Sequence, residues 1–149
     1  MKANQPDNCR LERQYRQALD SVKTGYEIVD ASQLIPYWND FLDTECPTVL
    51  EVELNGDEKS DYAVLIKNES YELVVILSTD NAYQVHTLLE IGFGVYDEGL
   101  GWGITRFADK RVNEEVDLEN DGIHFMKFES SASVYYWDGS RFNRVWLAD

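Results

Sequence analysis

Two short, almost continuous apolar runs constrain the fold of this chain more than any other feature. Residues 62–66 and 71–77 are apolar at nearly every position, which is typical of strands that are buried on both faces. The polar residues 68–70 between them are too few for a crossover, so the two strands are predicted to pair antiparallel. A third antiparallel strand is predicted over residues 83–91. We expect five side chains of the first two strands to be buried: Tyr62, Val64, Ile66, Val74 and Ile76.

The segment before these strands has helical rather than alternating periodicity. Apolar side chains in residues 11–22 recur with the spacing of one helix face, and Gly25 is a natural stop. A second helix is predicted to begin near Asp30 or Ser32, with Pro36 in its first turn. Its apolar stripe would consist of Leu34, Trp38, Phe41 and Leu42.

The remaining strands are predicted from alternation and from turn signals. Residues 50–54 alternate between apolar and acidic side chains, as in a strand with one face exposed to solvent. Two further hairpins are predicted, one pairing 114–118 with 123–128 and one pairing 133–137 with 141–147 around Asp138 and Gly139. The predicted fold class is therefore α+β.

In this prediction, two N-terminal helices pack on an antiparallel β-meander of about six or seven strands. The length fits a single domain over residues 1–149, of which residues 1–10 could form a loose N-terminal arm.

The charge of the chain is strongly acidic and unevenly distributed. The 28 acidic and 13 basic residues give a net charge of −15, whereas residues 1–25 alone are slightly basic. An acidic surface repels phosphate and anionic lipid, so neither nucleic acid nor a membrane is expected as a partner. It attracts a basic protein or a cation, unless the charge serves only solubility.

The segment 92–103 contains five of the nine glycines of the chain and three aromatic residues. One interpretation is a flexible binding loop in which aromatic anchors and acidic residues contact a basic partner. Its contact residues would be Phe93, Tyr96, Asp97, Glu98 and Trp102. The other interpretation is a glycine-rich sheet corner whose aromatic side chains fold back into the core. The segment has no phosphate-loop pattern.

A second candidate site precedes the apolar run at residue 62. Glu53, Asn55, Asp57 and Asp61 have the spacing of oxygen ligands in a calcium loop, although a plain turn at Asn55 also explains this stretch. The pattern resembles the D-x-N-x-D-G-x-x-D loop of FG-GAP or integrin-α-like repeats. Together with the segment 134–142, it makes the chain similar to uncharacterised bacterial single-domain proteins that carry one such degenerate loop.

The resemblance implies a calcium-stabilised structural module, but the loop departs from the family pattern. Glu53 replaces the first aspartate, and Glu58 stands where glycine would permit the sharp turn. Only one copy of the loop is present. We therefore expect no strong calcium site and predict no cofactor.

The two cysteines, Cys9 and Cys46, could form one disulfide or remain as free buried thiols. The sequence has no apolar run of transmembrane length and no signal peptide. A cytoplasmic location follows if Met1 is the native start, and a periplasmic or secreted one if a leader has been removed.

Motifs of the common enzyme classes are missing, and His86 and His124 lie in predicted strands without a ligand partner at metal spacing. The favoured hypothesis is a non-enzymatic acidic protein-binding domain, such as an immunity or inhibitor protein that occludes a basic partner. A calcium-stabilised FG-GAP-like module is the alternative, and a carboxylate-dependent hydrolase is the least favoured.

Overall fold

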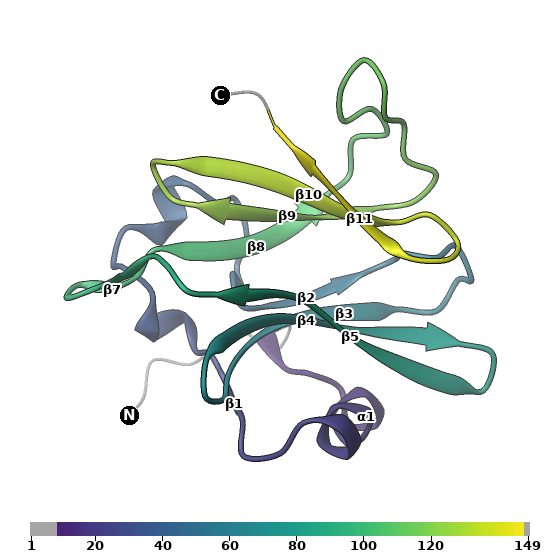
Figure 1. The fold of residues 1–149 in the computed structure, drawn as a ribbon, viewed down its shortest axis with the longest axis horizontal. Helices are drawn as coiled ribbons and strands as arrows, with labels where there is room; N and C mark the ends of the chain where they lie inside the picture. Colours follow the sequence, from purple (N-terminus) through teal and green to yellow (C-terminus); the bar gives the residue numbers. More distant parts are fainter. Residues whose placement is uncertain (1–8, 148–149) are drawn as a thin grey trace.

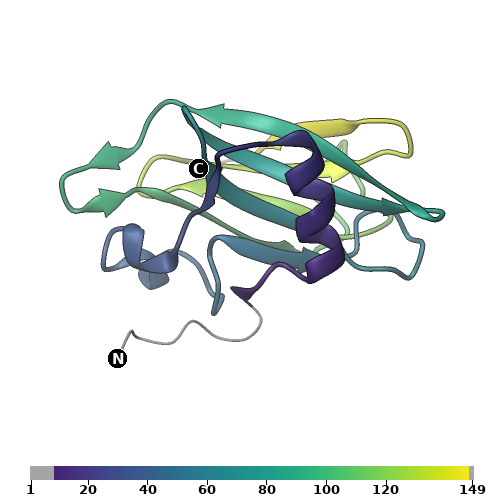
Figure 2. The ribbon, with the colours of Figure 1, turned by 90° about the horizontal axis from the view of Figure 1, so that it is seen from below.

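The computed structural model describes residues 9–147, which form a mostly β structure in three layers. A single α-helix, α1 (Arg13–Val22), lies across the outer face of a five-stranded sheet (Figure 2). A four-stranded sheet lies on the other side of that sheet, and a small two-stranded ladder projects at one end (Figure 1). The predicted N-terminal helix and antiparallel strands are confirmed. The single meander is wrong, because the strands divide among three sheets.

The five-stranded sheet contains the strands that the apolar runs predict. Its members are β1 (Glu27–Ile28), β2 (Val49–Val52), β3 (Asp61–Lys67), β4 (Tyr71–Thr79) and β5 (Ala82–Ile91). The strands β3, β4 and β5 are consecutive and antiparallel, as predicted, while β1 and β2 both pair with β3. All pairings in this sheet are antiparallel.

Both faces of this sheet are buried, which explains why its central strands are apolar throughout. The five predicted side chains are all at most 5% exposed and belong to the cluster that contains Tyr15 and Leu19 of α1. Alternate residues such as Leu65 and Val75 belong instead to the larger core cluster shared with the four-stranded sheet. The helix and the second sheet thus remove both faces of β3 and β4 from water.

The four-stranded sheet is built from the C-terminal half of the chain. Its strands run in the order β11-β10-β9-β8 and comprise β8 (Trp102–Phe107), β9 (Gly122–Lys127), β10 (Ser131–Trp137) and β11 (Phe142–Trp146). The predicted hairpin around Asp138 and Gly139 is confirmed as β10–β11.

The predicted pairing of residues 114–118 with residues 123–128 is wrong. Residues 114–118 form no strand, and β9 pairs with β8 instead. The strand β8 buries Trp102 and Ile104 completely, whereas the segment 114–118 carries three carboxylates and buries only Leu118. Burial of apolar area therefore selects β8 as the partner.

The predicted second helix is also wrong. Two short 3₁₀ turns, η2 (Ala31–Gln33) and η3 (Trp38–Asp40), take its place, and Leu34 between them is extended. The Ile35 amide donates to the carbonyl oxygen of Leu100 at 2.9 Å instead of forming a helical bond. Pro36 disfavours the α conformation at the residue before it, which favours this interruption.

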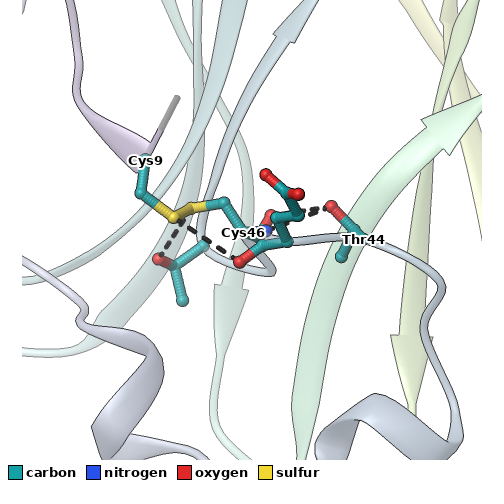
Figure 3. Close-up of a disulfide and its surroundings, with 5 residues drawn as sticks. Cys9, Thr44 and Cys46 are labelled. Carbon is teal, nitrogen blue, oxygen red and sulfur yellow. Dashed lines mark hydrogen bonds between the residues drawn. A yellow bond between two sulfur atoms is a disulfide. The ribbon is translucent and has the colours of Figure 1, made fainter. Parts of the chain in front are cut away.

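A disulfide joins Cys9 to Cys46 and so ties the start of the described chain to the segment before β2 (Figure 3). Both cysteines are at least 95% buried, in the cluster beneath α1. The Cys46 amide donates to the Thr44 hydroxyl at 3.2 Å beside the bridge. Of the two states that the sequence leaves open, the structure has the bridged one. No helix within residues 9–147 is long and apolar enough to cross a membrane.

Candidate functional site

The glycine-rich segment forms a hairpin rather than an open loop. It consists of β6 (Val95–Tyr96) and β7 (Gly99–Leu100), with Asp97 and Glu98 at the turn. The hairpin projects from one end of the two main sheets (Figure 1, at the left). The exposed tip is therefore carried by two paired strands rather than by an open loop.

Two glycines of this segment, Gly99 and Gly101, are closely packed. Gly99 has φ +139°, and a Cβ at this position would lie 2.7 Å from the carbonyl carbon of Leu34. A Cβ at Gly101 would clash with the ring of Tyr96, an exposed side chain that can move aside. Gly99 thus needs to be glycine because of its backbone conformation and its contact with the main chain of Leu34, whereas the requirement at Gly101 is weaker. One of the two interpretations of the sequence is a flexible loop. The structure instead has a hairpin that packs against residues 34–35.

The five candidate binding residues fall into two groups. Trp102 is fully buried in β8, and its indole N–H donates to the carbonyl oxygen of Phe93 at 2.9 Å. Phe93 is half-buried and lies edge-on to Phe125. These two side chains fold back into the core, so Trp102 is not available as a surface anchor.

The other three candidates, Tyr96, Asp97 and Glu98, are exposed at the hairpin tip. The tip lies beside residues that the sequence does not single out. Tyr37 and Glu129 line a hollow of 300 Å³ together with Tyr96 and Glu98. The charge of Glu98 raises the pKa of the Tyr37 hydroxyl, with smaller contributions from burial, Glu129 and Tyr96.

We call this region the hairpin surface and define it as Tyr37, Val95, Tyr96, Asp97, Glu98 and Glu129. Its apolar members are unusually exposed: Val95 is 58%, Tyr96 52% and Tyr37 38% accessible. Large apolar side chains beside carboxylates are suited to bind a partner that combines basic and apolar groups. The sequence does not identify Tyr37 as a surface residue, because it places Tyr37 within the expected second helix.

The second candidate, the acidic loop between β2 and β3, brings three carboxylates together. Ligand oxygens of Glu53, Asp57 and Asp61 all lie within 4.8 Å of one another. Glu53 accepts the Gly56 amide at 2.9 Å, and Asp57 accepts the Lys59 amide at 3.0 Å. The loop therefore organises these side chains through its own backbone.

Asp61 is the deepest of the three and is fully buried. Its two carboxylate oxygens accept the backbone amides of Leu54 at 2.9 Å and Ser78 at 2.7 Å. Burial raises its pKa to about 6, and these two hydrogen bonds oppose the rise. Because Asp61 is closed off from solvent and joins the residues after β2 to β4, its role is better explained as structural than as acid–base catalysis.

The sharp turn of this loop forms without the expected glycine. Glu58 adopts φ 66°, a left-handed conformation that costs a non-glycine residue roughly 1–2 kcal/mol. The amide group of Asn55 donates to the Ser78 carbonyl at 2.6 Å, while its side-chain oxygen is buried without a partner among residues 9–147. The loop thus matches a calcium site only in part, since calcium takes six to eight oxygen ligands.

The two histidines lie in strands, as predicted, with His86 in β5 and His124 in β9. Burial lowers the pKa of both imidazoles, which favours the neutral form near pH 7. The candidate functional features are therefore the hairpin surface and the acidic loop. The chain matches no protein-family model, no curated protein and no solved structure, so its function has to be argued from these residues.

Proposed function

We propose that this protein is a non-enzymatic, acidic protein-binding domain that occludes a basic partner through the hairpin surface. The observation that carries the proposal is the exposure of Val95 and Tyr96, at 58% and 52%, directly beside the Asp97–Glu98 turn. Such apolar side chains gain free energy when a partner covers them. An immunity or inhibitor protein is the closest functional analogy.

The charge of the chain supports the same proposal. A net charge of −15 produces a field that accelerates encounter with a positively charged surface. Asp97, Glu98 and Glu129 concentrate negative charge around the exposed tyrosines. The paired backbone of the hairpin adds to affinity, because it loses less entropy than an open loop would when the partner binds.

The experiment is affinity capture from the source cell with matched bait variants, followed by binding kinetics with the purified partner. Tyr96→Ala should weaken binding by about 2 kcal/mol, mainly through faster dissociation. The double variant Asp97→Asn/Glu98→Gln should slow association and reduce its salt dependence. Tyr83→Ala is the matched control, because Tyr83 is 41% exposed on β5, outside the hairpin surface. Equal binding by the Tyr96→Ala and Tyr83→Ala variants would refute the proposal.

The alternative function, a calcium-stabilised module, is favoured by the convergence of Glu53, Asp57 and Asp61 within 4.8 Å. We expect only weak binding, since Asp61 already accepts two amides and the Glu58 conformation is strained. Melting curves with calcium and with chelator should then nearly coincide. A saturable rise in melting temperature that Asp57→Asn abolishes would instead establish this function.

A further inference from the structure

A groove of 610 Å³ lies between β5 of one main sheet and β10 and β11 of the other. The two walls meet at His86 of β5, whose ring contacts those of Trp137 and Phe142. One wall is the middle of β5, from Val85 to Leu88, and the other is formed by Tyr135 and residues 140–144. Both ribbon views place β5 and β11 on the same side of the molecule (Figures 1 and 2). The volume is in the range of ligand-binding pockets.

Both strands that border this groove are edge strands. Within residues 9–147, β5 pairs only with β4, and β11 pairs only with β10. An edge strand presents unpaired backbone N–H and C=O groups, which can accept an additional extended segment. The groove therefore offers main-chain hydrogen bonds as well as side-chain contacts.

The inward face of β11 is aromatic and positively charged. The pairing of Arg144 with the buried Tyr135 places Arg144 on the face between the sheets, together with Phe142 and Trp146. The Arg144 guanidinium lies 3.9 Å from the ring centre of Trp146, which is 58% exposed. No carboxylate among residues 9–147 forms an ion pair with Arg144.

Tyr135, which lines the same groove, carries a buried polar atom. Tyr135 is 4% exposed, and its hydroxyl has no hydrogen-bond partner among the described residues. Such a hydroxyl is costly unless a ligand or water satisfies it. Arg144 donates to the Ser133 hydroxyl at 3.1 Å and lies 5.2 Å from the centre of the Tyr135 ring. On a chain with a net charge of −15, this arginine has no acidic partner among the described residues and can therefore attract an anion.

We propose that this groove binds an extended peptide segment with a carboxylate side chain, which adds as a strand to the free edge of β11. Every second side chain of the added strand enters the space between the sheets. A central glutamate then meets Arg144 and the Tyr135 hydroxyl, and apolar side chains on either side of it meet Phe142 and Trp146. This surface differs from the hairpin surface in residues and in the charge that it selects.

The probe is a blocked peptide of about seven residues, with threonine at alternate positions and valine, glutamate and valine at the inward ones. Binding is measured by titration calorimetry and by tryptophan fluorescence. Replacing the glutamate by lysine should weaken binding about tenfold or more. Alternate backbone amides of the added strand point toward β11, and the amides between them point away from it. N-methylation of the amides that point toward β11 should abolish binding, while N-methylation of the others should leave binding nearly intact.

Variants of groove residues, each compared with a control variant outside the groove, test whether the peptide binds there. Arg144→Gln should weaken binding of the glutamate peptide about fivefold or more, whereas Arg13→Gln, on the exposed face of α1, should not. Tyr135→Phe removes only the hydroxyl and should weaken binding about threefold. Tyr136→Phe is its control, because the neighbouring side chain points to the opposite face of β10.

Three results would each overturn the proposal. The first is the absence of saturable binding up to about 1 mM peptide. The second is equal affinity for the glutamate and lysine peptides, or equal loss from both methylated sets. The third is a concentration-dependent dimer in sedimentation that the peptide does not dissociate, because a second copy would then occupy this edge.

Discussion

Loss of the Cys9–Cys46 disulfide should destabilise the protein severely. The bridge closes a loop across a sequence separation of 37 residues. The chain-entropy relation for a loop of this length predicts that the bridge raises the free energy of unfolding by about 4 kcal/mol. Domains of ordinary size have only about 5–15 kcal/mol in total, so the expected loss is a large part of the stability.

The measurement is urea unfolding of three samples: the oxidised protein, the same protein in reductant, and a Cys9→Ala/Cys46→Ala variant. Tryptophan fluorescence reports the transition, because Trp102 is fully buried in the folded state. The reduced protein and the double variant should both lose about 3–4 kcal/mol, and the double variant should be insensitive to reductant. Unchanged midpoints on reduction would refute the reasoning and show that the unfolded chain is already compact.

Three further predictions concern the buried tryptophan and the acidic loop. Trp102→Ala should lower the free energy of unfolding by about 3–5 kcal/mol, against less than about 1 kcal/mol for Tyr96→Ala, as urea titrations can show. Glu58→Gly should raise the free energy of unfolding by about 0.5–1 kcal/mol, because it relieves the φ of 66°; a loss in thermal unfolding would contradict this. The raised pKa of Asp61, about 6 against 3.8, means that its stabilising effect is complete below pH 3.8 and is lost as the pH rises through 6. Unfolding free energies between pH 4 and 7 should therefore fall by roughly 2 kcal/mol more in the wild type than in Asp61→Asn, and parallel pH profiles would disprove the link.

The strands that the sequence predicts best are those whose burial leaves a local signature. The central strands β3 and β4 are covered by a helix on one face and a sheet on the other, so nearly every position is apolar. The strand β8 has no such signature because glycine interrupts it. A Cβ at Gly103 would lie 2.7 Å from the Leu42 side chain, so close packing requires glycine where a strand pattern would show a larger residue.

The region of the expected second helix shows another reason why the sequence predicts the fold only in part. Its apolar residues Leu34 and Leu42 are both 3% exposed, so the predicted burial is confirmed and the predicted helical conformation is wrong. Periodicity reports which side chains are buried, but a backbone bond from Ile35 to the distant residue Leu100 decides the conformation here. The same tertiary contact brings Tyr37 to the hairpin surface, which is why the sequence identifies only half of that surface.

The close contact between Gly99 and Leu34 affects which residues of the hairpin can be substituted during evolution. The main chain there is held by contacts that involve no tip side chain, namely the close approach of Gly99 to Leu34 and the bond between Ile35 and Leu100. Substitutions at Val95, Asp97 and Glu98 can therefore alter the exposed chemistry while the support beneath stays the same. The residues at the tip can therefore be exchanged without disturbing the backbone that supports them. Such a hairpin can adapt to a partner whose surface changes, or can accept a grafted recognition sequence.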